Sequence, residues 1–436
     1  MTQQPDFDDY LTFLCESLGH GKGHDRRAAA LQDYCRGLML PLARKSVEPL
    51  AASLSPYAVS ARHQSLHHFV AQSDWEDQSV LERVAEWVVP TLSKADDELY
   101  WIIDDTGFPK KGRHSVGVAR QYCGILGKQD NCQIAVTLSL ANATASLPVQ
   151  WRLYLPKEWA DDAERCKKAG IPAPTTFATK TEIALDQIQR AHASKLPCGT
   201  VVADAGYGHH EALRTKIAAL GLTYMLAVKS NTRVWAPGTA PLPPEPYSGI
   251  GRPATRHLPA DDQRPMSVEA LANSLPKAAY RAQTWRQGTN TPLSSRFAAV
   301  RVRTAHHKAK HGLPGPEEWL LIEWPKGEPK PRHYWLSTLD PRSSREQLVR
   351  AAQCRWRIER DYQELKQEFG LGHYEGRNWR GFHHHATLCI AAYGYLVRQR
   401  LRHPRSKKNA GICQDFALPE DYTPRGASPR ATSRSW

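Results

Sequence analysis

The hydrophobic pattern of this chain changes near residue 100, and that change limits the folds it can adopt. Before it, segments such as LTFLCESL, EPLAASL and SVLERVAEWVVPTL repeat apolar residues at helical spacing, with almost no β-branched runs. After it, LYWIID, RQYCGIL, CQIAVTLSLA and PVQWRLYLP are apolar runs typical of strands. The sequence therefore predicts a small helical domain followed by a β-meander.

Helices and strands alternate beyond the meander. TKTEIALDQIQRAHASK and HHEALRTKIAALG predict helices, whereas GTVVAD and TYMLAVK predict buried strands, which together indicate a mixed α/β sheet. Residues 231–342 are rich in Pro, Gly, Arg and Trp, with strands expected in RFAAVRVR, EWLLIEW and HYWLSTL. One long helix is predicted over 343–369, with Ser343 and Glu346 spaced as a capping box and Gly370 as its stop, and a last helix over 382–402.

The chain is strongly basic. Its 58 Lys and Arg against 44 Asp and Glu give a formal net charge of +14 over 436 residues. That balance suits a polyanionic partner such as nucleic acid, although a generally basic solvated surface gives the same number. Nine cysteines without a CxxC pair favour free thiols in a reducing compartment over a disulfide framework or a zinc site. No apolar stretch has membrane length, so we expect a cytoplasmic protein.

Two predicted strands end in aspartates. WIIDDTGFPKKG leads a hydrophobic strand into Asp104 and Asp105, and VVADAGYG leads another into Asp204. A carboxylate at the end of a buried strand is held rigidly, as a metal ligand requires. An aspartate that merely starts a turn would look the same in either segment alone.

A third carboxylate, Glu359, lies among cations in RWRIERDYQELKQEFGLG. At 100° per residue, Arg355 and Lys366 both fall within roughly 40° of it on a helix. An ordinary amphipathic helix with an i, i+4 ion pair of about 0.3 to 0.5 kcal/mol would explain this segment alone. Together with two strand-end aspartates, it indicates oxygen donors for two divalent metals about 4 Å apart, with the cations facing DNA phosphates.

At this point the chain resembles a known family, the DDE-type insertion-sequence transposases of the Tyr-Arg-Glu-Lys signature group. RWRIE followed by Lys366 resembles the signature segment, and DDTGFPKKG, GVARQYCGILGKQDNCQIAV, ADAGYG and GLGHYEGRNWRGFHHH resemble the segments around it, over roughly residues 10–400. The resemblance implies an RNase H-like core interrupted by a β-strand domain. It also implies Mg²⁺-dependent cleavage at transposon ends and strand transfer.

Carried over residue by residue, the resemblance makes Asp104, Asp204 and Glu359 the catalytic carboxylates and metal ligands. Asp104 is favoured because Asp-x-Thr is the family pattern, and Asp105 is the fallback. Two Mg²⁺ ions are implied, with Mn²⁺ able to substitute. The position of the signature tyrosine holds Ala352, which departs from the pattern and leaves the excision route, through a DNA hairpin or otherwise, open.

The resemblance also implies partners, and the hydrophobic pattern and composition give the domain plan. One partner is double-stranded DNA, both as the terminal inverted repeats of the transposon and as the target. The other is a second copy of the chain, which forms a homodimer in the synaptic complex. The expected location is the bacterial cytoplasm, in association with the nucleoid and without a membrane. The expected domains are a helical N-terminal DNA-binding domain at 1–95, an RNase H-like catalytic core at 96–230, a β-rich insertion at 231–342, the helical second part of the core at 343–402, and a basic, disordered tail at 403–436.

Further residues are candidates for DNA contact. Arg355 and Lys366 are the signature partners of the glutamate. Lys110, Lys111 and Arg113 directly follow the first aspartates, and we expect them to contact phosphate.

Aromatic and histidine residues allow two interpretations each. Trp356 is expected either to stack on a displaced base or to pack as a helix aromatic. The three histidines 383–385 are consecutive, do not converge on a metal, and are predicted to face DNA or solvent.

Two other functions fit parts of the sequence. DDTG matches the Asp-x-Thr-Gly turn of phosphohydrolases that form an aspartyl phosphate, but that activity leaves Glu359 and the net charge unexplained. A catalytically inactive, transposase-derived DNA-binding protein would retain the charge. The presence of all three carboxylates argues against such decay.

Overall fold

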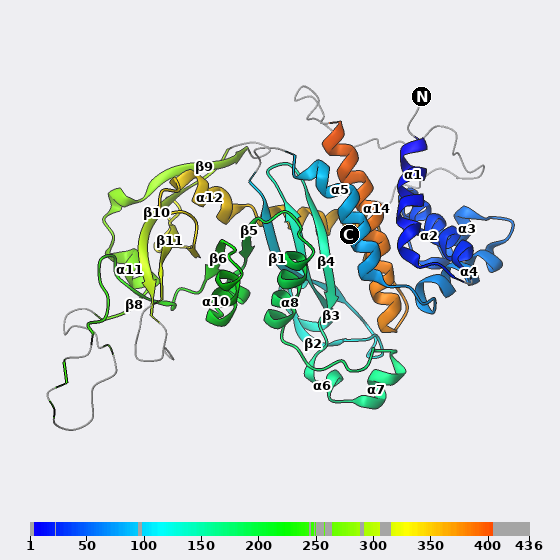
Figure 1. The fold of residues 1–436 in the computed structure, drawn as a ribbon, viewed down its shortest axis with the longest axis horizontal. Coiled ribbons are helices and arrows are strands. Elements are labelled where there is room, and N and C mark those ends of the chain that lie inside the picture. Colours follow the sequence, from blue (N-terminus) through cyan, green and yellow to red (C-terminus); the bar gives the residue numbers. More distant parts are fainter. Residues whose placement is uncertain are drawn as a thin grey trace, which may run out of the picture. The chain divides into compact units, whose positions relative to one another are not determined.

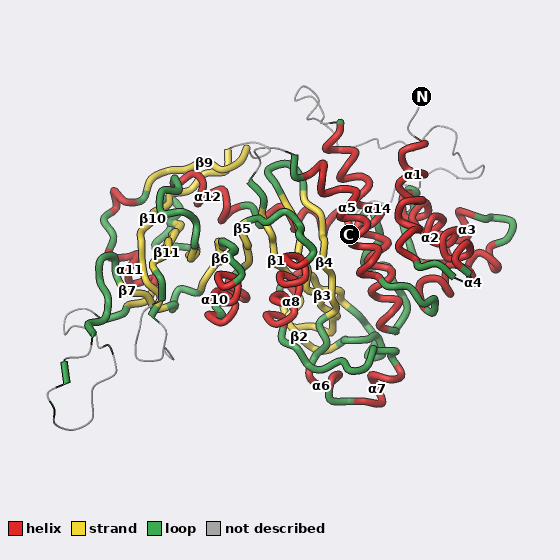
Figure 2. The backbone as a smooth tube through the Cα atoms, in the orientation of Figure 1, coloured by secondary structure: helices red, strands yellow, loops and turns green. Residues whose placement is uncertain are grey.

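The computed structural model describes residues 4–21, 23–94, 98–243, 246–247, 249, 257, 264–287, 292–305 and 315–403. It divides into two compact units: Met1–Thr91 with Gln363–Trp436, and Leu92–Tyr362. The first unit is helical in its described residues and the second holds the sheet (Figures 1 and 2). The boundary falls inside helix α13, Trp356–Gln367. The tail predicted to be disordered lies outside the described residues except for His403.

The first unit packs short amphipathic helices against one long apolar helix. Helix α14 contacts α2 and α4, and most of its residues from Gly381 to Val397 are buried. The helices predicted before residue 95 are confirmed, and the last predicted helix begins at Trp379, where Asn378 caps it. No helix among the described residues is long and apolar enough to cross a membrane. The helices of this unit are α1 (Gln4–Cys15), η1 (Glu16–Leu18), α2 (His24–Met39), α3 (Val47–Leu54), α4 (Val59–Ala71), α5 (Asp77–Leu92) and α14 (Trp379–Arg402).

The prediction that histidines 383–385 face DNA or solvent is wrong. All three are buried on α14. The His384 ring stacks on Trp75 with centroids 3.6 Å apart, and Nδ1 of His385 lies 2.8 Å from the Tyr34 hydroxyl. The imidazoles of His384 and His385 therefore satisfy buried polar groups of the N-terminal segment, more than 300 residues away in the chain, whereas His383 bonds the Trp379 carbonyl of its own helix.

The second unit is built on one mixed sheet, twelve-stranded within the described residues. Its order is β2-β3-β1-β5-β6-β12-β11-β10-β7-β8, with β4 paired to β3 and β9 to β10. Strands β1, β5 and β6 run parallel, whereas β3 is antiparallel to β1. The predicted α/β class with an RNase H-like mixed sheet is thereby confirmed. The strands are β1 (Tyr100–Pro109), β2 (Ala119–Cys123), β3 (Lys128–Ala141), β4 (Ser146–Leu153), β5 (Thr200–Ala203), β6 (Tyr224–Val228), β7 (Arg233–Trp235), β8 (Met266–Ser267), β9 (Arg281–Gln287), β10 (Pro292–Thr304), β11 (Glu317–Glu323) and β12 (His333–Ser337).

The strand-rich segment 231–342 continues the same sheet. Strand β12 pairs antiparallel with β6, and β11, β10, β7 and β8 follow outward. Figure 1 shows β10 and β11 on the side of β6 that is away from β1. The strands predicted in RFAAVRVR, EWLLIEW and HYWLSTL are β10, β11 and β12. Backbone hydrogen bonds therefore join this segment directly to the central strands.

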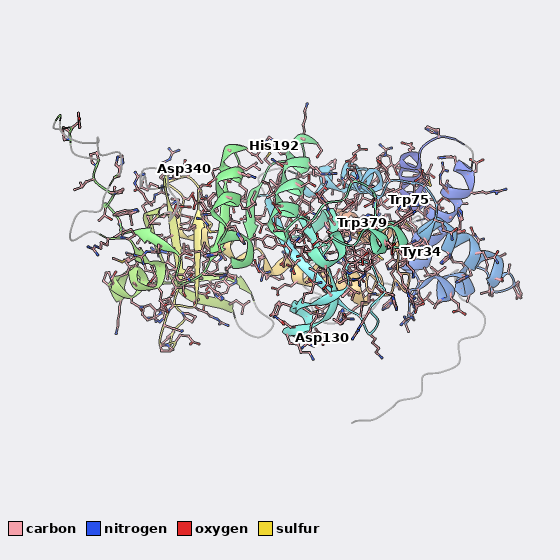
Figure 3. All side chains as sticks on the ribbon, turned by 90° about the horizontal axis from the view of Figure 1, so that it is seen from below. Tyr34, Trp75, Asp130, His192, Asp340 and Trp379 are labelled. Atoms are coloured by element: carbon pink, nitrogen blue, oxygen red, sulfur yellow. The ribbon has the colours of Figure 1, made fainter. Side chains whose placement is uncertain are left out.

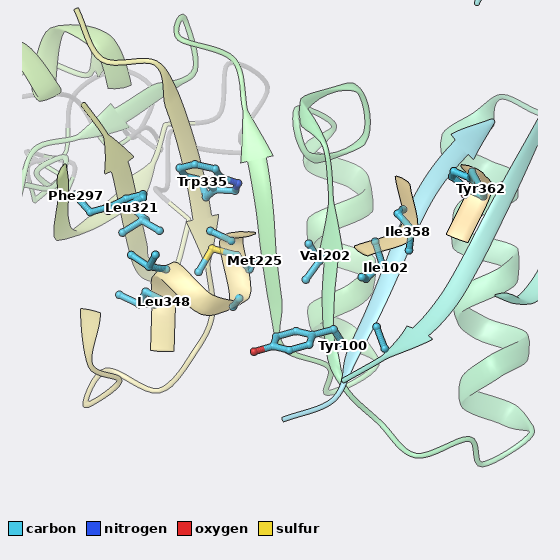
Figure 4. Close-up of a cluster of buried hydrophobic side chains, with 14 residues drawn as sticks. Tyr100, Ile102, Val202, Met225, Phe297, Leu321, Trp335, Leu348, Ile358 and Tyr362 are labelled. Carbon is cyan, nitrogen blue, oxygen red and sulfur yellow. The ribbon is translucent and has the colours of Figure 1, made fainter. Parts of the chain in front are cut away.

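Helices cover the two faces of the central strands. Because alternate strand residues point to opposite faces, Tyr100 and Ile102 share one face of β1. Both belong to a buried cluster with Leu348 of α12 (Arg345–Gln353) and Ile358 of α13 (Figure 4). Each buried Leu or Ile there contributes about 1.5 to 3 kcal/mol relative to exposure. The other helices of this unit are α6 (Lys157–Ala160), α7 (Ala163–Lys168), α8 (Lys180–Ala193), α9 (Ala205–Gly208), α10 (Glu211–Ala219), α11 (Val268–Ser274), η2 (Gly124–Leu126) and η3 (Lys277–Ala279).

The single helix predicted over 343–369 is wrong, because the chain forms α12 and α13 instead. The amide nitrogens of Arg357 and Ile358 bond three residues back, to the carbonyls of Cys354 and Arg355, so the turn between the two helices is tighter than an α-helix. The capping box is also shifted by one residue, to Ser344 and Gln347. The apolar spacing is similar in both helices, so it gave no sign of the break.

Candidate active site

The strand register places Asp104 next to Asp204. Strands β1 and β5 pair in parallel through Ile103 and Ala203, so the following residue of each strand is an aspartate. Neighbouring strands lie about 4.8 Å apart. The chain leaves the sheet at Asp204, whose Oδ1 accepts hydrogen bonds from the backbone amides of Gly206 at 2.8 Å and Tyr207 at 3.3 Å. Asp204 is therefore held by the start of α9.

The prediction that Asp104 ends its strand is wrong. Strand β1 continues to Pro109 and stays paired with β3 throughout, so Asp104 lies in its middle, opposite Thr137. Only the pairing with β5 ends at Ile103. The site therefore lies where β5 ends, and β1, which continues past this point, holds Asp104 rigidly beside that end.

Burial dominates the electrostatics of Asp104. Its side chain is 13% exposed, and burial raises its pKa to about 7. The guanidinium of Arg355, with Nη1 at 2.7 Å from Oδ2, lowers the pKa, and the nearby Asp204 raises it further. A buried carboxylate whose ionised form is disfavoured gains most from an added cation.

Asp105 points to the opposite face of the sheet. Its Oδ2 lies 2.9 Å from Nζ of Lys180 at the start of α8 and accepts a 3.4 Å hydrogen bond from the Tyr207 hydroxyl. The alternation of strand side chains thus separates the two adjacent aspartates. Asp104, and not Asp105, shares a face with α13.

Arg355 connects Asp104 to Glu359. Its Nη1 bonds Asp104 and its Nη2 lies 3.2 Å from Oε1 of Glu359, which is exposed. The i, i+4 pair expected from the sequence is present, and the contact to Asp104, 251 residues away in the chain, adds a second anion to the same guanidinium. One cation therefore bridges two of the three predicted catalytic carboxylates.

A buried tyrosine, Tyr362, lies near this site. The hydroxyl of Tyr362 bonds Oγ1 of Thr137, the strand partner of Asp104. Burial raises the pKa of Tyr362 well above its usual value, and the charge of Asp104 adds to the rise. Helical spacing marks Tyr362 as inward-facing, but nothing in the sequence connects it with Thr137.

The other predicted DNA contacts are spread along the second unit and its boundary. Trp356 opens α13 half-buried, with the Arg357 guanidinium 5.0 Å from its ring centroid. Lys366 lies seven residues after Glu359 on α13, beyond the boundary between the units, and its role stays a prediction. Ala352, at the position of the signature tyrosine, is buried in the core cluster.

The predicted phosphate contacts lie away from the aspartates. Lys110, Lys111 and Arg113 follow the far end of β1, and the Lys110 amide bonds the Asn131 carbonyl. Lys110 is six residues from Asp104, about 20 Å along an extended strand. These residues and the aspartates are therefore not brought together.

The carboxylates offer hard oxygen donors suited to Mg²⁺ or Mn²⁺. Asp104 and Asp204 lie side by side, as two ligands of one ion would, and Asp104 lacks full charge compensation. Within the described residues, however, no group of three or more acidic, His or Cys side chains is arranged to hold a metal ion. The three carboxylates fit a divalent metal ion on condition that the Glu359 side chain turns toward the two aspartates and Arg355 releases its contacts with Asp104 and Glu359.

The fold agrees with what the family comparison shows. The model of the DDE superfamily endonucleases matches residues 14–292. This is 279 of 436 residues, and the chain belongs to that family. Membership implies dependence on a divalent metal ion. The matched region includes both aspartate strands and ends before Glu359.

One curated relative narrows the comparison. A 169-residue segment is 31% identical to a protein of Microchaete diplosiphon described as a probable transposase for insertion sequence element IS701. The segment covers 38% of this chain and 41% of that protein. The similarity thus spans less than half of the relative's length.

Proposed function

We propose that the protein is a transposase that cuts double-stranded DNA at the terminal inverted repeats of an insertion sequence and joins the freed ends to target DNA. One observation carries the proposal: Asp104 lies beside Asp204 across β1 and β5, and Arg355 links Asp104 to Glu359 on the same face of the sheet. Family membership and the similarity to a probable IS701 transposase support it.

Asp104, Asp204 and Glu359 would hold two Mg²⁺ ions, for which Mn²⁺ could substitute. When bound, the ions would activate the attacking oxygen and stabilise the leaving oxygen of a phosphodiester. The chain supplies fixed donor positions: the amides of α9 hold Asp204, and the Asp105 amide donates to Oδ1 of Asp104 at 2.9 Å. Glu359 is exposed and is the donor that must reorient.

In this proposal Arg355 changes partners. Its guanidinium neutralises Asp104 and Glu359 while no other cation is bound to them. It turns to a DNA phosphate once other cations compensate the two carboxylates. Charge-assisted contacts to phosphate are strong enough to orient the strand for in-line attack. Trp356 and Lys366 would each contact DNA, and a homodimer would hold the two ends in the bacterial cytoplasm.

The test is cleavage of the DNA that flanks the gene for this chain. The protein is incubated with that DNA and Mg²⁺, and the nicks are mapped. We expect metal-dependent cuts at the ends of the inverted repeats. Binding without any cut in Mg²⁺ or Mn²⁺ would support the DNA-binding alternative, and failure to bind would contradict the proposal as a whole.

A further inference from the structure

A cavity of about 510 Å³ lies in the second unit beyond the far end of β1. Three segments form it: the loop after β1, the β2–β3 ribbon and the α6–α7 helices, which lie together in Figure 1. Figure 3 labels Asp130 at this edge of the unit. The charged residues that line it are Lys111, Arg113, Arg120, Asp130, Glu158 and Arg165.

Asn131 fixes the loop that carries two of the cations. The side-chain Nδ2 of Asn131 donates to the backbone carbonyl oxygens of Lys110 at 2.6 Å and Gly112 at 2.9 Å. The backbone carbonyl of Asn131 accepts from the Lys110 amide at 2.9 Å. Asn131 also faces Arg120 in the β2–β3 register. The backbone that bears Lys111 and Arg113 is thus fastened to the ribbon that bears Arg120.

Arg165 closes the cavity from the other side. Its guanidinium lies 3.6 Å from the centroid of the Trp159 ring, and its Nη2 donates to the Arg113 carbonyl at 3.1 Å. Trp159 is buried, and its Nε1 donates to the Val118 carbonyl at 2.8 Å. Arg165 is therefore held in place by a buried aromatic ring before any ligand arrives, which lowers the entropic cost of binding an anion.

The lining is positive overall. Four cations face two carboxylates, and one of these, Asp130, is already paired with Lys128 at 3.3 Å. Hydrogen bonding from the Asn131 amide and the contact with Lys128 lower the pKa of Asp130. Asp130 therefore stays ionised, and its negative charge offsets part of the positive charge of the cavity lining. A net charge of +2 remains from the lining groups themselves. This favours a phosphate over a neutral ligand.

The position of the cavity relative to Asp104 suggests how a phosphate would reach it. Thr137 pairs with Asp104, and Asn131 lies six residues earlier on the same strand, β3. Six residues of extended chain cover about 20 Å. Duplex DNA rises about 3.4 Å per base pair, so this separation matches about six base pairs.

We propose that the cavity binds a backbone phosphate of the duplex about six base pairs from the bond that is cut, with the DNA lying on the surface of the unit, parallel to the direction of the buried strands β1 and β3. The site reads position and carries no base specificity, because its cations contact phosphate only. This inference rests on the proposed function, since it takes the DNA to be cut at Asp104. It adds Arg120 and Arg165 to the DNA contacts predicted from the sequence.

The test combines protein variants with DNA that carries one neutral methylphosphonate at successive positions from the cleavage site. Affinity is measured without divalent metal for the wild type, Arg120→Ala and Arg120→Lys, with Arg342→Ala as the control. Arg342 is 91% exposed on the turn after β12 and lies outside the cavity.

We expect Arg120→Ala to weaken binding about tenfold, as for loss of a charge-assisted contact, and to reduce the slope of log K against log salt by about 0.9. A methylphosphonate about six positions from the cut should weaken the wild type and have little further effect on Arg120→Ala. Arg120→Lys should retain most of the affinity, and Arg342→Ala should bind normally.

Other results would overturn the inference and leave the function standing. If the wild type binds and cuts the ends but Arg120→Ala matches Arg342→Ala, the cavity does not contact DNA. The same follows if the effects of Arg120→Ala and the methylphosphonates add independently at every position. Tight binding of inorganic phosphate at the cavity without any coupling to DNA would assign it to a small anion instead. A wild type that neither binds nor cuts the ends would refute the proposed function itself.

Discussion

Asp104→Asn should stabilise the metal-free protein while abolishing cleavage. Asparagine resembles the protonated acid in shape and removes the buried charge. Raising the pKa from 3.8 to about 7 means that the ionised form costs the folded state about 4 kcal/mol, at 1.36 kcal/mol per pH unit. The pKa already includes the favourable contact with Arg355, so the gain of about 4 kcal/mol is net of that contact.

The sign of the pH dependence follows from the direction of the shift. Below the unfolded pKa, Asp104 is protonated in both states and the variant should match the wild type. As the pH rises from about 4 to about 7, only the folded state keeps the proton, so wild-type stability falls while that of Asp104→Asn does not. The gain should therefore grow across this range and level off above about pH 7.

The assay is urea unfolding in the presence of EDTA at several pH values. Asp105→Asn is the matched control, because Asp105 is the next residue on β1 but pairs with Lys180 on the opposite face. It should be neutral or destabilising. If Asp104→Asn lost as much stability at about pH 8 as the control variant, the conclusion that the buried charge of Asp104 destabilises the folded state would be refuted.

Three further predictions concern the helix, the surface charge and the fold. Arg355→Ala and Lys366→Ala should each slow cleavage at least about tenfold, or 1.4 kcal/mol on the barrier, without an equal loss of thermal stability; a variant that melts earlier but cuts normally would return that residue to a packing role. DNA binding should fall steeply between low and physiological salt, and a flat log-log slope would argue against a nucleic-acid partner. Gly208→Ala should destabilise by about 1 to 3 kcal/mol, because its Cβ would meet the Ala227 carbonyl oxygen at 2.2 Å, whereas Gly112→Ala, with open space around it, should melt like the wild type.

Much of the fold was predictable because its signals are local. The strands β1, β5 and β6 are short apolar runs, and helix α8 has its Thr179 capping box in the sequence. The aspartates could be found for the same reason, since each follows such a run. Period-2 alternation could also have separated Asp104 from Asp105, had β1 been expected to continue beyond them.

The features that the sequence did not reveal depend on residues far apart in the chain. Arg355 bonds Asp104 across 251 positions, and Arg165 reaches Arg113 across 52. The buried histidines 383–385 carry no amphipathic signature, because their burial depends on partners such as Trp75. The sequence also gives no sign of the break before α13, because the spacing of apolar residues is similar in both helices.

The central claim is that Asp104, Asp204 and Glu359 act together on a phosphodiester. The most direct measurement is the rate of Mg²⁺-dependent cleavage of end DNA by the three single alanine variants, each with its DNA affinity. We predict that all three lose cleavage and retain most of their binding, because phosphate contacts elsewhere supply most of the affinity. Near-normal cleavage by any one variant would remove that residue from the site, and an inactive Asp105→Ala beside an active Asp104→Ala would contradict the assignment of the first aspartate.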